Sequence, residues 1–188
     1  EIARALCSGR FLKLDSGIAD EEAKEIIKQL QPEVSVFIDS QMGKSKSINI
    51  VNSIQPGNIL RLDPSIKVAE ARQIIQALSF GVDIFIDSKM EQAKRLKMAS
   101  FLCSGCFLKL DSGIAVEEAG GIVKELHPGT VLKLDPSINV EDAKKIVKEL
   151  PSGAILKLDP GMSVEDAKKI VKELQPGTVL KLDLSINV

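Results

Sequence analysis

The sequence predicts an α/β repeat fold. We expect a right-handed, horseshoe-like solenoid, with a single parallel sheet of about eight short strands on the concave face and helices on the convex face. Two kinds of residue that recur with one strict 24-residue period predict this fold. An aliphatic residue recurs at Leu6, Leu30, Ile54, Leu78, Leu102, Leu126, Leu150 and Leu174, and an aspartate recurs at Asp15, Asp39, Asp63, Asp87, Asp111, Asp135, Asp159 and Asp183. A period in this range is typical of stacked, identical supersecondary units.

The same period organises residues 1–188 as a single repeat array. We expect a partial helix at 1–6 and a partial repeat at 175–188, so the chain is expected to be a fragment of a longer array. The complete repeats are 7–30, 31–54, 55–78, 79–102, 103–126, 127–150 and 151–174.

The repeat at 127–150 shows the expected elements in order. Pro128-Gly129 predicts a turn. Leu132 and Leu134 alternate with outward residues over 131–135, which predicts a short strand. A helix follows, because its apolar residues are spaced i, i+3, i+4 and i+7 and charged residues fill its other face. That apolar stripe consists of Ala143, Ile146, Val147 and Leu150.

The spacing of these elements predicts curvature. Neighbouring strands lie about 4.8 Å apart, whereas packed helices prefer about 8–10 Å. A stack of strand–helix repeats must therefore bend, with the sheet on the inside.

The repeated pattern VLKLDPSI followed by a helix with a small residue and paired aliphatics resembles the leucine-rich repeat family, of the ribonuclease-inhibitor-like kind. The resemblance covers the whole chain and implies recognition of proteins. Two features depart from the family pattern. Gly129, Gly153 or Gly177 replaces the first leucine, and Ser137, Gly161 or Ser185 replaces the asparagine that forms a ladder in the family.

The repeated aspartate has two interpretations. Stacked carboxylates could bind cations. The favoured interpretation is structural, because an aspartate followed by Pro-Ser or Ser-Gly is typical of a turn in which the carboxylate accepts hydrogen bonds from its own backbone.

Composition excludes several function classes. The 25 basic and 26 acidic residues nearly cancel, so we expect neither a nucleic-acid partner nor a membrane partner. Three cysteines indicate a reducing compartment, which predicts the cytoplasm, or the host cytosol for a secreted bacterial effector. Cys103 and Cys106 are interpreted as incidental thiols, and His127 as an exposed side chain after a helix. We therefore expect no enzymatic activity, no cofactor and no metal.

Departures from the period indicate where a partner could bind. The first outward position of the strands reads Phe11, Ser35, Ile59, Asp83, Phe107, Val131, Ile155 and Val179, and the second reads Lys13, Phe37, Arg61, Phe85, Lys109, Lys133, Lys157 and Lys181. Aromatic residues and arginine are enriched at protein interfaces. The predicted partner-binding residues are Phe11, Lys13, Phe37, Arg61, Phe85, Phe107, Lys109 and Lys133. Two further departures, Ser47 and Arg95, replace the small helix alanine.

The leading hypothesis is a protein–protein interaction scaffold that binds a partner, and inhibits or recruits an enzyme, through the concave strand face. The alternative is a structural spacer or a self-assembling segment that associates end to end or through an edge strand.

Overall fold

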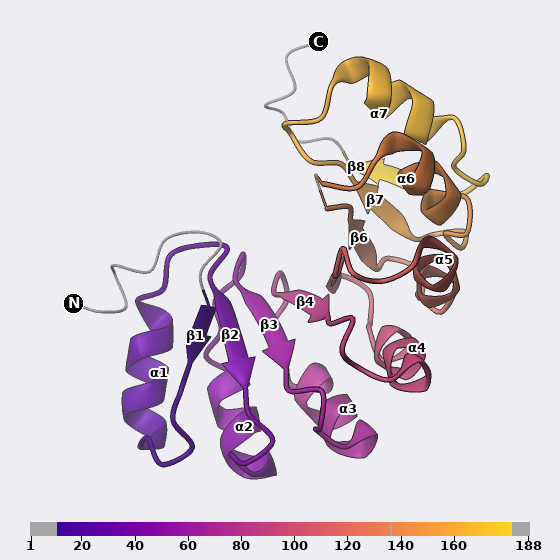
Figure 1. Cartoon of the computed structure of the whole chain (residues 1–188). Coiled ribbons are helices and arrows are strands. Elements are labelled where there is room, and N and C mark those ends of the chain that lie inside the picture. The colour runs from indigo at the N-terminus through magenta and orange to yellow at the C-terminus, as the bar shows by residue number, and fades with distance from the viewer. Residues whose placement is uncertain (1–10, 136, 182–188) are drawn as a thin grey trace. The chain divides into compact units, whose positions relative to one another are not determined.

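The computed structural model describes residues 11–135 and 137–181. Eight parallel strands, in chain order in one sheet, alternate with helices, which confirms the predicted α/β class and its repeating strand–helix units (Figure 1). The chain divides into two compact units, Glu1–Phe85 (unit 1) and Ile86–Val188 (unit 2), and each is described by itself. The predicted partial helix at 1–6 and the end of the last partial repeat, including Asp183, lie outside the described residues.

The elements begin in unit 1 with β1 (Phe11–Lys13), α1 (Asp20–Lys28), β2 (Ser35–Ile38), α2 (Lys44–Val51), β3 (Ile59–Leu62) and α3 (Val68–Gln76). Strand β4 (Asp83–Ile86) includes the boundary between the units. Unit 2 continues with α4 (Gln92–Ser100), β5 (Phe107–Leu110), α5 (Val116–Lys124), β6 (Val131–Lys133), α6 (Val140–Val147), β7 (Ile155–Lys157), α7 (Val164–Val171) and β8 (Val179–Lys181).

Strand pairing follows the sequence period without a shift. In unit 1, Leu12 pairs with Val36 and Val36 pairs with Leu60. In unit 2, Leu108 pairs with Leu132 and Leu132 with Leu156. Equivalent residues of successive repeats are therefore neighbours on the strands, and each sequence position becomes a row of side chains.

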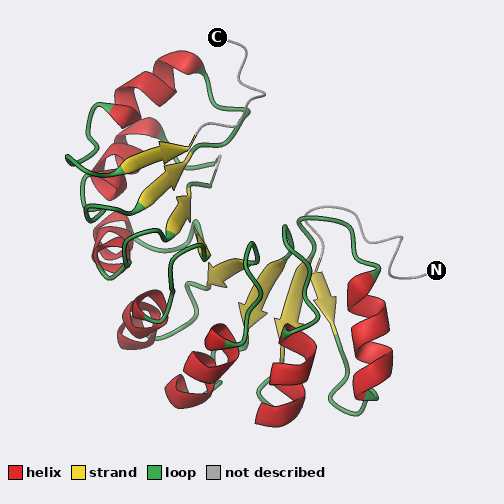
Figure 2. Cartoon of the chain, turned by 180° about the vertical axis from the view of Figure 1, so that it is seen from behind, coloured by secondary structure: helices red, strands yellow, loops and turns green. Residues whose placement is uncertain are grey.

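Helices cover one face of the strands in each unit (Figure 2). The buried apolar side chains come from both the strands and the helices. All four residues of the predicted apolar stripe, Ala143, Ile146, Val147 and Leu150, are buried. The strand residues Leu132 and Leu134 are buried with them. The alternation within the strand and the 3.6-residue period of the helix thus identify the same core.

Glycines in the turns before the strands link successive repeats. The N–H of Gly129 donates to the carbonyl of Gly153 at 2.7 Å, and Gly153 donates in turn to Gly177 at 2.8 Å. These glycines have positive φ angles, and the angle at Gly153 is 81°. A Cβ atom added at Gly153 would lie only 2.9 Å from Cβ of Pro128. At Gly153, glycine therefore permits both the left-handed conformation and the close approach to the preceding repeat. In unit 1, Glu33 adopts the same left-handed conformation at φ 66°.

The repeated aspartates form the predicted turns. Each of the seven described members accepts a hydrogen bond through Oδ1 from the backbone N–H two residues later, namely at Gly17, Gln41, Ser65, Lys89, Gly113, Ser137 and Gly161. The carboxylates thereby satisfy turn donors that helices and strands leave unpaired. Among residues 11–135 and 137–181, no group of three or more potential ligand side chains is placed to hold a metal ion.

One polar side chain in the core of unit 1 lacks a hydrogen-bond partner. Asn58 is 0% exposed and occupies the helix-facing position that Val34 and Val82 hold in neighbouring repeats. Neither its Oδ1 nor its Nδ2 is hydrogen-bonded.

No helix in the described part of the chain is long and apolar enough to cross a membrane.

Candidate partner-binding face of the strands

Four predicted site residues are adjacent on the strands of unit 1. Lys13, Phe37, Arg61 and Phe85 are in register on β1, β2, β3 and β4, and we call them the mixed row. Because Val36 and Ile38 on either side of Phe37 are buried, strand alternation directs the ring to the face away from the helices. Lys13 is exposed, and the other three side chains are half-buried.

Lys13 contacts both the ring and a carboxylate of the next repeat. Its Nζ lies 5.4 Å from the centroid of Phe37 and 2.9 Å from Oδ2 of Asp39. The hydrogen bond to Asp39 raises the pKa of the Lys13 ammonium. The pKa of Asp39 is lowered, first by the N–H of Gln41 in its own turn and second by Lys13.

Arg61 connects three strands of the same unit. Its Cζ lies 3.6 Å from the centroid of Phe85 on β4, which is close cation–π geometry. Its Nε donates a hydrogen bond to Oγ of Ser35 on β2 at 3.1 Å. The guanidinium is therefore held in place between its two neighbouring strands.

The first outward position in unit 1 is less accessible than the sequence suggested. Phe11 is 67% exposed, but Ser35, Ile59 and Asp83 are buried, with Ser35 4% exposed and Asp83 1% exposed. The accessible part of this face consequently consists of the mixed row together with Phe11, which precedes Lys13 by two residues on β1.

The second outward position in unit 2 is a row of lysines. Lys109, Lys133, Lys157 and Lys181 are in register on β5, β6, β7 and β8. The predicted residues Phe107, Lys109 and Lys133 are all half-buried. Nζ of Lys133 lies 4.6 Å from the centroid of Phe107 on the neighbouring strand. Unit 2 thus brings together the other three predicted site residues.

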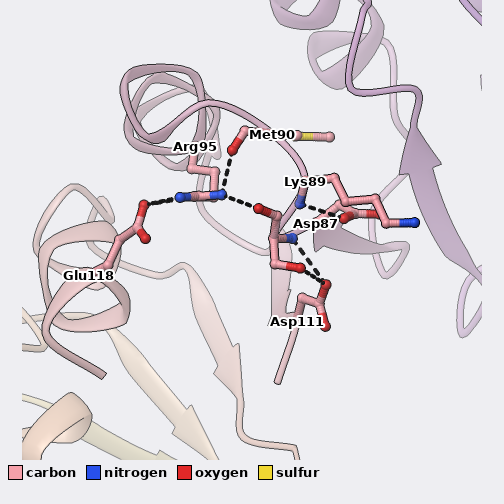
Figure 3. A network of polar contacts seen from close by, with 7 residues as sticks. Asp87, Lys89, Met90, Arg95, Asp111 and Glu118 are labelled. Atoms are coloured by element: carbon pink, nitrogen blue, oxygen red, sulfur yellow. Dashed lines mark hydrogen bonds and ion pairs between the residues drawn. The ribbon is translucent and has the colours of Figure 1, made fainter. Parts of the chain in front are cut away.

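A polar network in unit 2 explains Arg95, for which the sequence predicted no role. The buried guanidinium takes the place of the small alanine of other repeats and donates to the carbonyls of Ser88, at 2.6 Å, and Met90 (Figure 3). Its Nε donates to Oε1 of Glu118 at 2.8 Å. In the same network, Oγ of Ser88 donates to Oδ2 of Asp111 at 2.6 Å. These bonds tie the turn after β4 to the next repeat, so the network is structural.

Helix α2, in which Ser47 replaces the small alanine, also forms hydrogen bonds to backbone carbonyls. Nζ of Lys46 donates to the carbonyls of Ser16, at 2.6 Å, and Ile18 in the turn of the preceding repeat. The buried hydroxyl of Ser47 donates to the carbonyl of Gly43 at 2.9 Å. Lys46 thus joins α2 to the preceding repeat, whereas the bond of Ser47 lies within its own repeat.

A cavity of about 220 Å³ in unit 2 lies between the turns that follow β5 and β6. Several of its polar groups already have partners: Asp135 accepts from the N–H and hydroxyl of Ser137, and Asn139 is bonded to Asp142. The cavity is smaller than the roughly 300–1,000 Å³ typical of small-molecule sites. The strand face remains the candidate site.

Comparison with known proteins identifies no family. No protein-family model matches the chain, and no curated protein matches it. Among solved structures, the chain is similar to dihydrodipicolinate synthase from Oceanobacillus iheyensis, with 13% sequence identity and a TM-score of 0.35. The match covers 90% of this chain and 52% of that one, so the chain spans about half the length of that enzyme.

Proposed function

We propose that this chain is a protein-interaction scaffold that binds a partner protein through the outward strand face and has no enzymatic activity of its own. The observation that carries the proposal is the mixed row, in which Arg61 and Phe85 are in contact on adjacent strands. Arginine and aromatic side chains dominate the binding energy of protein interfaces. Because Arg61 is already held by Ser35, its side chain would lose little further entropy when a partner binds.

The proposed scaffold is a right-handed, leucine-rich-repeat-like solenoid whose strands line a concave surface. Pairing in register supports this arrangement, since every repeat adds one strand and one helix at the same step. The different spacings of strands and helices favour curvature towards the strand side. We further propose that the scaffold works in a reducing compartment such as the cytosol. Its partner there would be another protein, such as an enzyme that the scaffold inhibits or recruits.

The alternative function is structural, as a spacer or a self-assembling segment. One observation favours it: Phe11 on β1 and Val179 on β8 are 67% and 51% exposed, on the first and last strands in the sheet order. Apolar residues on edge strands promote pairing with another chain. This function would require no binding at the mixed row.

The test compares partners captured from a cell extract by the tagged full chain and by two mixed-row variants. Lys13→Glu reverses an exposed charge, and the double variant Arg61→Ala/Phe85→Ala removes the central contact. The matched control, Glu25→Ala/Lys28→Ala, removes an exposed ion pair of α1 on the helix side of the same unit. We expect the mixed-row variants to lose a partner that the control retains.

Circular dichroism melts distinguish lost contacts from lost folding. The proposal would be overturned if every captured protein bound the mixed-row variants as tightly as the wild type. Concentration-dependent light scattering by the purified chain, unchanged by these variants, would support the structural alternative instead.

A further inference from the structure

Two thiols lie side by side in the turn between α4 and β5 of unit 2. The Sγ atoms of Cys103 and Cys106 are 3.2 Å apart. The turn is closed by a hydrogen bond from the N–H of Cys106 to the carbonyl of Cys103, at 3.0 Å, and Gly105 has a φ angle of 84°. A tight turn with a left-handed third residue favours glycine at that position. The backbone therefore holds the two side chains at the ends of one short turn.

The two thiols differ in their surroundings. Both are free; Cys103 is exposed and Cys106 is half-buried. Burial raises the pKa of the Cys106 thiol to about 11, and the hydrogen bond with Cys103 acts in the same direction. Cys106 is therefore protonated at neutral pH, and a dissolved oxidant meets Cys103 first.

We propose that Cys103 and Cys106 form a modification site that is converted reversibly between a dithiol and an intra-turn disulfide by hydrogen peroxide or by a small-molecule disulfide. A disulfide bond is about 2.05 Å long, so the sulfurs must approach by about 1.2 Å from their present separation. The intervening residues, Ser104 and Gly105, already place both side chains on the same turn.

The reaction with peroxide proceeds in two steps. The Cys103 thiolate attacks one peroxide oxygen and the O–O bond breaks, which gives Cys103 sulfenic acid and hydroxide; the proton lost by Cys103 converts the hydroxide to water. The Cys106 sulfur then attacks the Cys103 sulfur and the S–O bond breaks. The oxygen leaves as a second water with the Cys106 proton. Two electrons pass from the sulfurs to peroxide, and a dithiol reductant reverses the change by exchange.

Contacts of the turn indicate what the disulfide would stabilise. The N–H of Gly105 donates to the carbonyl of Gly129 at 2.8 Å, and the N–H of Val131 donates to the carbonyl of Cys106 at 2.9 Å. The hydroxyl of Thr130 donates to the carbonyl of Cys103. A cross-link that keeps this turn closed would therefore also protect its bonds to the next repeat from opening.

Other repeats supply matched control residues. Ser79 occupies the position of Cys103, and Ala154 occupies the position of Cys106. Cys103→Ser and Cys106→Ala therefore introduce residues that the repeat already accepts. Cys7→Gln, which copies Gln31, removes the third thiol and provides the background for all measurements.

The experiment equilibrates the full Cys7→Gln chain with mixtures of reduced and oxidised glutathione, and separately treats it with hydrogen peroxide. We expect a loss of two hydrogens by mass spectrometry, a peptide cross-linked between Cys103 and Cys106, and full recovery with dithiothreitol. The equilibrium constant for disulfide formation should be at least roughly tenfold higher in the folded chain than in urea, because the folded turn brings the thiols together. Oxidation should also raise the melting temperature, by linkage.

Cys103→Ser and Cys106→Ala should each form a mixed disulfide with glutathione and no cross-link. An equal or lower equilibrium constant in the folded chain would overturn the proposal, as would sulfinic acid at Cys103 without a cross-link. Tight zinc binding that prevents oxidation would also overturn it in favour of a metal site. If Cys7→Gln does not fold, peptide mapping of the oxidised wild type gives the same decision.

Discussion

The guanidinium of Arg61 lies over the ring of Phe85, with 3.6 Å between Cζ and the ring centroid, while Nε of Arg61 is bonded to the buried hydroxyl of Ser35. A single side chain thus joins β2, β3 and β4. The contact couples the stability of unit 1 to the same residues that we propose for partner binding, so its free energy can be measured without the partner.

A double-mutant cycle should measure this contact directly. We expect Arg61→Ala and Phe85→Ala to show a coupling free energy of about 0.5–2 kcal/mol in urea unfolding, because a partly desolvated cation–π pair has that strength. The corresponding cycle of Lys13 and Phe37 is the control. It should give a smaller coupling, since Lys13 is exposed and its Nζ lies 5.4 Å from the ring centroid. Equal coupling in both cycles would contradict this.

The Arg95 network should contribute measurably to the stability of unit 2. We expect Arg95→Ala to lower the free energy of unfolding by about 2–4 kcal/mol, because it leaves Glu118 without its charge partner and removes the donor from the carbonyls of Ser88 and Met90. Chemical denaturation of the full chain provides the measurement. Glu118→Gln retains the shape and removes the charge, so it should have a smaller effect. An Arg95→Ala chain as stable as the wild type would show that the repeat tolerates alanine here without loss.

Replacing Asn58 should stabilise unit 1. Its buried amide has lost its hydration without gaining a hydrogen bond, so Asn58→Val should raise the free energy of unfolding by about 1–2 kcal/mol. The neighbouring residues Val34 and Val82 show that valine fits this position. The matched control is Thr130→Val in unit 2, where the hydroxyl is bonded to Cys103, and the gain should be smaller. A destabilised Asn58→Val chain would indicate that the amide has a partner in solution.

Asp39 should titrate below an ordinary aspartate. Its pKa is lowered in the folded chain, so the stability that it contributes is present above the ordinary pKa of 3.8 and is lost as the pH falls through the lowered value. Carboxyl carbon NMR in the folded chain gives the midpoint. Lys13→Ala should move that midpoint only part of the way back, because the N–H of Gln41 is the larger cause. A full return to 3.8 would make Lys13 the main cause.

The period was sufficient to predict the elements, their register and the buried stripe. The positions of Leu132, Leu134 and Ile146 in the core follow from alternation and helical spacing alone. The turn role of the aspartates also followed from local sequence, since each carboxylate bonds to a backbone group only two residues away. These features depend on short-range geometry, which the sequence pattern determines.

The burial and the contacts that side chains acquire from neighbouring repeats did not follow from the pattern. Ser35 and Asp83 are at outward positions and are nevertheless buried, because exposure depends on the side chains of neighbouring strands. The bonds of Arg95 join one helix to its own turn and to the next helix, and only assembled repeats bring these groups together. The period identified Arg95 and Phe85 as exceptions, whereas their partners came from the structure.

The hydrogen bonds between turn glycines affect how easily the protein can gain or lose repeats during evolution. The bond from Gly129 to Gly153 and the bond from Gly153 to Gly177 join identical backbone groups, and neither depends on a side chain. Excision of residues 153–176 would bring Gly177 to the place of Gly153 and restore the same bond. Recombination between near-identical segments of the gene could therefore shorten or lengthen the protein by whole repeats without a mismatched junction, leaving natural selection free to adjust length separately from surface chemistry.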